Sequence, residues 1–302
     1  MSESIQGIVV ASRGKSFDVR SDEHRVYRCD VRQKVKVAAT RETPVAVGDD
    51  VLFTPADDGS GAIDKVLPRR TSFYRPAKGG ETGNKQIIVT NLDQLAVIAS
   101  VKSPPLKTGL IDRFIIAARV GQMKPVIVIN KIDLEERNIA QAVADIYTSA
   151  GFEIHLTSAE TGEGIDRLSA ALNHHRTLFA GHSGAGKSTI LNALIPGLNL
   201  KTKEVSDYSN RGKHTTTSIE LFELPSGGFV ADSPGLKVMG LWEVPADAIA
   251  DYYPEFERYS GDCRFQPCSH RHEPDCAVKA AVQRGEISDF RYENFVAIAD
   301  SL

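Results

Sequence analysis

The residues with the clearest potential for chemistry form one glycine-rich stretch. Residues 181–188 read Gly-His-Ser-Gly-Ala-Gly-Lys-Ser, which is the G-x-x-x-x-G-K-S pattern of a phosphate-binding loop. Glycines let the backbone curl closely enough for several N–H groups to point at one anion, and the following helix adds the positive end of its dipole. Lys187 can bridge the β- and γ-phosphates, and the Ser188 hydroxyl can ligate Mg²⁺. An apolar strand before the stretch and a helical segment after it favour this interpretation over a simple glycine-rich turn.

Two loops earlier in the chain have the composition of a guanine-binding site. Residues 130–133 read Asn-Lys-Ile-Asp after an apolar strand. The Asp133 carboxylate can accept hydrogen bonds from both N1–H and the amino group of guanine, a pair that adenine cannot donate. Asn130 and the Lys131 stem can fix this loop and cover the base. Residues 157–159, Thr-Ser-Ala, end another strand and can present a backbone N–H to the guanine oxygen. Each pattern alone is also typical of an ordinary polar loop; together, beside a phosphate-binding loop, they favour GTP.

Two later segments have the composition of parts that sense the γ-phosphate. Residues 211–217 read Arg-Gly-Lys-His-Thr-Thr-Thr, and a threonine hydroxyl there, assigned to Thr216, can complete the Mg²⁺ shell. Residues 232–235 read Asp-Ser-Pro-Gly after an apolar strand. Asp232 can hold the metal through water, and the Gly235 amide can contact the γ-phosphate. Asp-x-x-Gly is also a common turn, but its place after the phosphate-binding loop favours the nucleotide role.

The order of these segments is reversed relative to most GTPases, which place the phosphate motifs before the base-reading motifs. A sheet closes either way, because permutation joins the old termini and opens a different loop. Apolar strands at 94–101, 125–129 and 152–156 alternate with helical segments, which predicts a mainly parallel sheet covered on both faces. The buried face of the helix that ends at Gly151 is predicted from its apolar spacing to consist of Ile139, Ala142, Val143, Ile146 and Tyr147.

A cluster of metal-type ligands lies near the end of the chain. The spacing Cys263-x4-Cys268-x-His270-x5-Cys276 matches a closed tetrahedral Cys₃His zinc site, with one structural Zn²⁺ per chain. The alternative is three buried thiols and a surface histidine. Helices are predicted over 277–284 and 289–299. Zinc knuckles are common RNA modules, and the basic residues near the site could meet phosphate: Arg264, Arg271, His272, Lys279 and Arg284.

The first part of the chain is predicted to be a small β-barrel, OB-like or SH3-like. Strands are expected from Gly7, after residues 47–49 and over 61–67, and residues 27–37 alternate almost strictly. The apolar set of that alternation includes Cys29, which we expect in the core. The other set presents Arg28, Arg32, Lys34 and Lys36, either as a face that tracks a nucleic-acid backbone or as a solvated face that discourages edge pairing.

Composition and charge limit the class of protein and the partners it can bind. The chain has 302 residues, 41% of them hydrophobic and 25% charged, with a net charge of -3, so any binding to nucleic acid must use local patches. The sequence has neither an apolar signal region nor a run of membrane-spanning length, which predicts a cytoplasmic protein with no membrane partner. The predicted division is an OB-like barrel at 1–70, a flexible linker at 71–86, a GTPase domain at 87–240 and a zinc-binding helical domain at 241–302.

The combination of these motifs resembles the RsgA/YjeQ family, the circularly permuted, ribosome small-subunit-dependent GTPases of bacteria. The residues that carry the resemblance are those at 130–133, 181–188, 212–217 and 232–235 and the Cys₃His spacing; residues 110–113, Leu-Ile-Asp-Arg, also fit. The resemblance implies an N-terminal OB fold, a central permuted α/β GTPase domain and a C-terminal zinc domain. It also implies a role in late maturation of the small ribosomal subunit, contact with its rRNA, and GTP hydrolysis stimulated by that subunit. We expect a monomer.

The water-positioning residue is the least determined part of the site. Leu236 stands where Ras-like enzymes place a glutamine, and leucine cannot orient water. The resemblance points instead to His214, although the sequence itself is equally consistent with a surface residue. The predicted catalytic residues are therefore His214 and Lys187. The predicted nucleotide-binding residues are Asn130, Lys131, Asp133, Ser158, Ala159, Gly181, His182, Ser183, Gly184, Ala185, Gly186, Lys187, Ser188, Thr189, Thr216, Asp232 and Gly235. A second hypothesis is a nucleotide-gated RNA-binding scaffold whose slow hydrolysis is incidental.

Overall fold

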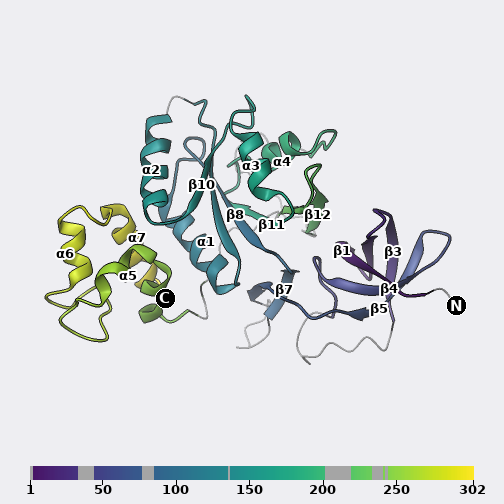
Figure 1. Cartoon of the computed structure of the whole chain (residues 1–302), viewed down its shortest axis with the longest axis horizontal. Helices are drawn as coiled ribbons and strands as arrows, with labels where there is room; N and C mark the ends of the chain where they lie inside the picture. Colours follow the sequence, from purple (N-terminus) through teal and green to yellow (C-terminus); the bar gives the residue numbers. More distant parts are fainter. Residues whose placement is uncertain are drawn as a thin grey trace, which may run out of the picture.

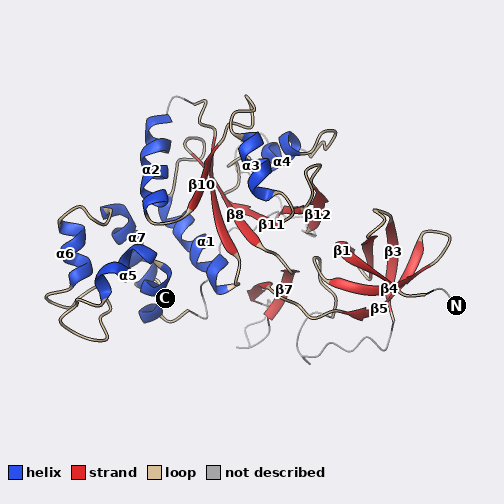
Figure 2. Ribbon diagram, viewed as in Figure 1, coloured by secondary structure: helices blue, strands red, loops and turns tan. Residues whose placement is uncertain are grey.

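The computed structural model describes residues 3–32, 44–76, 85–134, 137–200, 219–232, 241 and 244–302. An all-β barrel at the N-terminus, a central α/β domain and a small helical domain at the C-terminus follow one another along the longest axis of the molecule (Figures 1 and 2). Six residues that we singled out lie outside the described ranges: Lys34, Lys36, His214, Thr216, Gly235 and Leu236.

The N-terminal barrel consists of five strands: β1 (Ile5–Arg13), β2 (Ser16–Ser21), β3 (Val26–Val31), β4 (Asp50–Pro55) and β5 (Ser60–Val66). The order is β1-β2-β3-β5-β4, and pairing of β1 with β4 closes the barrel. Its core is built by Val9, Val19, Cys29, Phe53 and Ile63, each fully buried. The predicted barrel and the predicted core position of Cys29 are thus confirmed.

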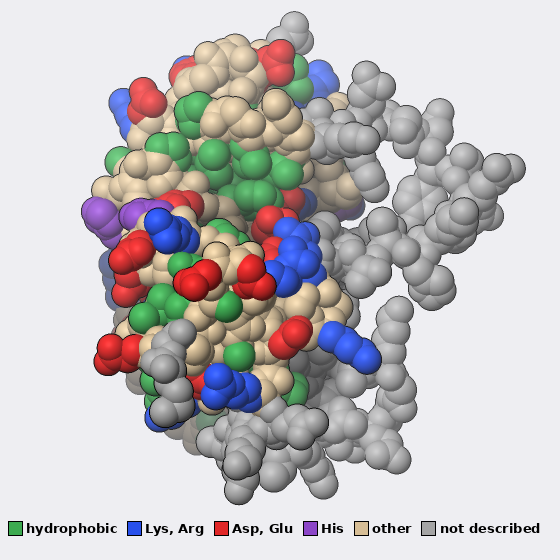
Figure 3. Space-filling model, turned by 90° about the vertical axis from the view of Figure 1, so that its right-hand side faces the viewer, with side chains coloured by type: hydrophobic (Ala, Val, Ile, Leu, Met, Phe, Trp, Pro, Cys, Tyr) green, Lys and Arg blue, Asp and Glu red, His purple; other side chains and the backbone are tan. Residues whose placement is uncertain are grey.

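The outward face of β3 carries its own counter-charges. Arg28 Nε lies 2.5 Å from Asp18 Oδ1, and Arg32 Nε lies 3.0 Å from Asp64 Oδ1. Figure 3 views the molecule from the barrel end and shows Lys and Arg side chains interspersed with Asp and Glu. The described part of this face therefore has mixed charge, which is the pattern of a solvated surface more than of a uniform basic track.

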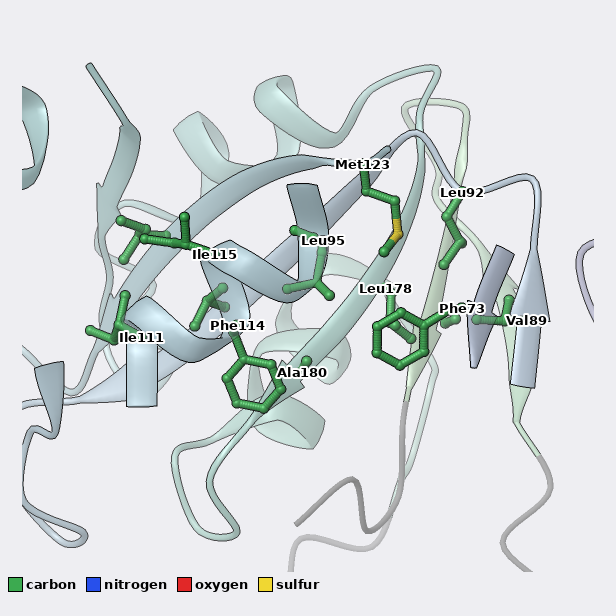
Figure 4. Packing of buried hydrophobic residues seen from close by; sticks show 14 of the residues in the cluster. Phe73, Val89, Leu92, Leu95, Ile111, Phe114, Ile115, Met123, Leu178 and Ala180 are labelled. Carbon is green, nitrogen blue, oxygen red and sulfur yellow. The ribbon is translucent and has the colours of Figure 1, made fainter. Parts of the chain in front are cut away.

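A short hairpin follows the barrel, made of β6 (Ser72–Pro76) and β7 (Lys85–Thr90). These strands occupy both ends of the stretch that we expected to be a flexible connector; residues 77–84 lie outside the described ranges. Phe73, Ile87 and Val89 are buried, and Phe73 and Val89 pack into the core of the central domain, which holds the hairpin against it. Figure 4 shows Phe73 and Val89 beside Leu92 and Leu178 of that domain.

The central sheet has the order β10-β9-β8-β11-β13-β12, in which all strands but β12 run parallel. The strands are β8 (Gln94–Ser100), β9 (Lys124–Asn130), β10 (Glu153–Leu156), β11 (Arg176–Gly181), β12 (Glu220–Glu223) and β13 (Phe229–Asp232). Helices α1 (Thr108–Val120) and α2 (Arg137–Ser149) pack on one face. Figure 4 shows Ile111, Phe114 and Ile115 of α1 in this core. Helices α3 (Ile165–Leu172) and α4 (Lys187–Leu194) pack on the other. The predicted parallel sheet with both faces covered is confirmed.

One predicted helix face is wrong in part: Tyr147 is buried and Val143 packs against the core, as predicted, but two other members of the face are exposed. Ile139 is 52% exposed and Ala142 is also exposed, whereas Ala140 and Ala144 are buried together with Tyr147. Small alanines let α2 approach the sheet closely, and the hydroxyl of Tyr147 is anchored by the Asp112 carboxylate at 2.7 Å. The buried face therefore runs through Ala140, Ala144 and Tyr147, with Val143 beside it, and leaves Ile139 and Ala142 exposed.

The barrel is joined to the central sheet by both backbone and side chains. Strand β1 pairs with β12, so the barrel strands and the central strands form one sheet of 11 strands. Arg176 at the start of β11 donates to Asp50 Oδ1 at 2.7 Å and to the Gly48 carbonyl at 3.3 Å. Gly48 has φ of 91°, and a Cβ there would lie 2.1 Å from the Thr90 carbonyl oxygen. Position 48 therefore requires glycine.

The C-terminal domain contains a 3₁₀ helix, η1 (Ala246–Tyr252), and helices α5 (Pro254–Ser260), α6 (Ala277–Gln283) and α7 (Asp289–Ala299). The predicted helices at 277–284 and 289–299 are confirmed, and η1 and α5 were not predicted. Its core continues onto α1, because Ile116 and Ala117 pack with Phe256 and Phe295. No helix in the described part of the chain is long and apolar enough to cross a membrane.

Candidate functional site

The glycine-rich stretch forms a strand–loop–helix unit, as predicted. Strand β11 ends at Gly181 and helix α4 begins at Lys187. Gly181, Gly184 and Gly186 have φ values of 147°, 84° and 97°, in the region that favours glycine. A Cβ on Gly181 would lie 2.0 Å from the Ile98 carbonyl oxygen, and one on Gly186 would lie 2.3 Å from Asn130 Nδ2. The loop therefore requires glycine both for its curvature and for its contacts with neighbouring strands.

Lys187 lies with its ammonium group against the loop itself. Nζ donates to the carbonyls of Gly181 at 3.0 Å and His182 at 3.1 Å. Burial lowers the pKa of Lys187, and the opposing charge of Asp232 raises it. An ammonium that is partly stripped of water and aimed along a phosphate-binding loop can exchange these carbonyls for phosphate oxygens.

Asn130 holds three of the predicted segments together. Its Oδ1 accepts hydrogen bonds from Thr157 Oγ1 at 3.2 Å and from the Ala159 amide at 3.1 Å, and its Nδ2 donates to the Ala185 carbonyl at 3.1 Å. Asn130 is only 2% exposed. One buried side chain thus joins the end of β9, the Thr-Ser-Ala loop after β10 and the phosphate-binding loop after β11, three segments far apart in the sequence.

The two base-reading side chains beside Asn130 differ in burial. Asp133 is exposed and Lys131 is half-buried. Burial lowers the pKa of Lys131, opposed by the charge of Asp133, and Lys131 Nζ donates to the Ser103 carbonyl. Ser158 is fully buried, and its Oγ accepts a hydrogen bond from the Thr161 amide at 3.2 Å. The Ser158 hydroxyl therefore shapes its own loop.

The described magnesium-type ligands, Ser188 and Asp232, lie at the carboxyl ends of two adjacent strands. Ser188 and Thr189 lie in the first turn of α4, directly after β11. Asp232 ends β13, the parallel neighbour of β11, in register with Phe179. Parallel strands meet with their carboxyl ends at one edge of the sheet, which is where ligands bind in open α/β sheets. A hydroxyl and a carboxylate at that edge are the oxygen donors that Mg²⁺ prefers.

The four predicted zinc ligands converge. Their donor atoms all lie within 4.8 Å of one another. Cys263 Sγ lies 3.8 Å from Cys276 Sγ and 3.6 Å from His270 Nδ1, and His270 Nδ1 lies 3.4 Å from Cys276 Sγ. Tetrahedral bonds from zinc of about 2.3 Å to sulfur and about 2.0 Å to nitrogen place S···S pairs about 3.8 Å apart and S···N pairs about 3.5 Å apart. The donor set and its spacing fit one structural zinc, ligated through Nδ1 of the histidine.

Basic residues around this metal site are largely engaged with carboxylates. Arg264 lies 2.6 Å from Asp275, Arg271 lies 2.9 Å from Asp300, and Arg284 lies 2.6 Å from Glu286. Residues 241–302 contain 12 Asp and Glu against 6 Lys and Arg. Local pairing and an acidic balance do not favour the phosphate contacts that we expected from these arginines.

Sequence reasoning missed two parts of the molecule that bear on the site. One is the backbone carbonyl of Ser103, which accepts a hydrogen bond from Lys131. Every residue has such a carbonyl, so the sequence gives no sign of this contact. The other is the contact between Asp112 of α1 and Arg291 of α7, both 1% exposed. Asp112 belongs to the Leu-Ile-Asp-Arg stretch that we noted. The apolar residues on both sides of Asp112, in the run Leu-Ile-Asp-Arg-Phe-Ile-Ile, are the feature of the sequence from which its burial could have been predicted.

Comparison with known proteins gives the same assignment over the full length. The profile of the RsgA GTPase family matches residues 66–242. The chain is 39% identical over 306 residues to the small ribosomal subunit biogenesis GTPase RsgA of Gemmatimonas aurantiaca, covering 100% of this chain and 99% of that protein. It is 38% identical over 309 residues to the protein of the same name from Chlorobaculum tepidum, with 100% and 99% covered.

Two solved structures share the whole arrangement. The crystal structure of YjeQ from Thermotoga maritima matches with a TM-score of 0.80 and 33% identity, covering 99% of both chains. YloQ, a circularly permuted GTPase, matches with a TM-score of 0.76 and 25% identity, covering 99% of this chain and 95% of the other. With the family profile matching more than half of its length and relatives matching all of it, the chain belongs to the RsgA GTPase family.

Proposed function

We propose that this GTPase acts in late maturation of the small ribosomal subunit, that its GTP-bound form binds that subunit, and that the subunit stimulates hydrolysis and so ends the bound state. The observation that supports this best is the Asn130 junction, which ties the base-reading loops to the phosphate-binding loop. Full-length identity of 39% to a small ribosomal subunit biogenesis GTPase supports the choice of subunit.

In the proposed mechanism each residue type has one task. Asp133 accepts the two guanine donors, the Lys131 stem covers the base, and the amides of residues 181–188 hold the phosphates. Lys187 neutralises charge that develops between the β- and γ-phosphates. Ser188 and Asp232, with Thr216, would hold the Mg²⁺ that accompanies GTP and offsets the same charge. His214 positions the attacking water, and Gly235 contacts the γ-phosphate.

The proposed function also implies a cellular location, an oligomeric state and a surface for rRNA. We place it in the cytoplasm as a monomer that contacts rRNA of the small subunit, with division points near residues 70, 86 and 240. The mixed charge of the described barrel face and the acidic balance of residues 241–302 favour rRNA contact through a few local groups rather than through one basic surface.

Steady-state GTP turnover tests the proposal. Purified small subunits should raise the turnover of the parent protein many-fold, whereas large subunits should not. Lys187→Ala should abolish turnover in both conditions, and His214→Ala should lower the stimulated rate while leaving the affinity for GTP nearly unchanged, because positioning water is a transition-state task. Subunit binding without any stimulation would favour the alternative, a nucleotide-gated RNA-binding scaffold.

A further inference from the structure

The loop between β8 and α1 touches the base-reading motif at two points. The Val101 amide donates to the Asn130 carbonyl at 3.2 Å, continuing the register in which Ser100 pairs with Asn130. Two residues further on, the Ser103 carbonyl accepts a hydrogen bond from Lys131 Nζ. Neither contact belongs to the phosphate-binding loop or to the Thr-Ser-Ala loop, so this segment is a separate boundary of the site.

The loop is itself fixed at several places, which suits it to hold another group. Ser100 is 2% exposed, and its Oγ donates to the Pro104 carbonyl at 2.9 Å. Val101 is buried, and Leu106 packs against the core below α1. A small cavity lined by Ser100, Pro104 and Gly181, among others, places the loop next to the phosphate-binding loop. The Ser103 carbonyl therefore sits on a supported turn.

A fixed hydrogen-bond partner restricts the conformations of a lysine side chain. Its four-carbon stem has several rotamers, and fixing them on ligand binding costs entropy. The backbone next to Lys131 is held by the Ile132 amide, which donates to the Thr157 carbonyl at 3.2 Å, and the Ser103 carbonyl holds the far end of the Lys131 side chain. A Lys131 stem held at both ends is already in position before guanine binds. Less conformational entropy is then lost on binding, which favours affinity.

We propose that residues 100–104 brace Lys131 and thereby act as a positioning element for guanine, with the Ser100 hydroxyl as its key side chain. This inference rests on the proposed reading of guanine by residues 130–133. Ser100 touches no nucleotide; it acts through the Pro104 and Ser103 backbone on Lys131. The brace affects binding of the base and leaves the phosphate-transfer step to other residues.

The test is the GDP dissociation constant, measured by isothermal titration on the full-length, zinc-loaded protein. Ser100→Ala removes the hydroxyl, and Pro105→Gly increases the backbone freedom of the exposed part of the loop. Each should weaken GDP binding by about threefold to tenfold, the range set by one hydrogen bond. GTP turnover at saturation should stay at the parent value, so that KM rises while kcat does not. Thr71→Ala is the matched control, because it removes a similar bond from a hydroxyl to the Leu92 carbonyl, at 2.7 Å, in the hairpin region; it should leave the GDP affinity unchanged.

A double-mutant cycle separates a positioning role from a merely structural one. In a Lys131→Ala background, Ser100→Ala should produce no further loss of GDP affinity, because the side chain it supports is gone. An equal loss in both backgrounds, or parent-like affinity of both loop variants, would overturn the brace. Failure of the underlying function looks different: the parent protein itself would then bind ADP as tightly as GDP.

Discussion

Arg291 on α7 forms a buried ion pair with Asp112 on α1, and each of these residues is only 1% exposed. The Asp112 carboxylate also accepts hydrogen bonds from Tyr147 Oη at 2.7 Å and Asn294 Nδ2 at 2.8 Å, and Arg291 Nε donates to Glu255 at 2.6 Å. The Arg291 guanidinium further lies 4.4 Å from the centre of the Tyr253 ring. The zinc domain is thus attached to the GTPase domain by a buried polar network in addition to apolar packing.

Arg291→Met should be strongly destabilising, because it leaves the Asp112 carboxylate buried without its partner. Removing one member of a buried pair costs about 3–5 kcal/mol. The measurement is the urea midpoint of the full chain, followed by fluorescence. Arg284→Met, which removes an exposed pair with Glu286, is the matched control and should leave the midpoint unchanged. If both variants shift the midpoint equally, the buried network is not what holds the domain.

Asp133→Asn should weaken guanine nucleotide binding by about 2–4 kcal/mol, because two charge-assisted hydrogen bonds are lost or become repulsive. GDP affinity is the quantity to measure. Asp145→Asn is a suitable control, since Asp145 is an exposed carboxylate on α2. Equal affinity of the unaltered protein for GTP and ATP would refute the base-reading assignment.

Zinc analysis should find one ion per chain, and Cys276→Ser should abolish it. In small zinc modules the apparent free energy of Zn²⁺ binding is about 10–16 kcal/mol and stabilises the folded state. The C-terminal domain should therefore unfold without zinc. The central domain has a sheet of its own and should still bind GDP. Cys29→Ala changes a thiol far from the cluster, buried in the barrel, and should keep the full zinc content. Freshly purified protein with no zinc would count against the site.

Cys29 should resist alkylation in the native protein. Burial, followed by the charges of Asp30 and Asp18, raises the pKa of its thiol from 9.0 to about 12. Since the folded pKa lies above the unfolded one, the stability that this thiol contributes is intact below pH 9.0 and is lost as the pH rises towards 12. Iodoacetamide labelling of the zinc-loaded protein at pH 8, read by mass spectrometry, checks this. Labelling of Cys29 as fast as in urea would show that the thiol is not protected.

Much of the site was readable from the sequence because it consists of short motifs at strand ends. A buried strand followed by Asn130, or by the Thr-Ser-Ala loop, places those groups at one edge of a parallel sheet whatever the rest of the fold does. The zinc ligands were readable for a similar reason, since four donors within 14 residues, from Cys263 to Cys276, leave few arrangements.

The remaining features depend on contacts between distant segments, which periodicity does not encode. The face of α2 was predicted only in part, because apolar spacing does not distinguish Ala140 and Ala144, which face the core, from Ile139 and Ala142, which are exposed. The Ser103 contact uses a backbone carbonyl, which every residue has. The pairing of β1 with β12 joins strands of two domains that are far apart in the sequence, through a sheet edge that alternation does not mark.

Binding of the small subunit in the two nucleotide states tests the central claim most directly. The proposed account makes the segment after Asp232 the covalent link from the nucleotide site to the zinc domain, so the γ-phosphate should control subunit binding. Cosedimentation with small subunits, at two salt concentrations, should show tighter binding with a non-hydrolysable GTP analogue than with GDP, by about 1–3 kcal/mol of coupling. Higher salt should weaken binding in both states. The same affinity with both nucleotides would contradict the account.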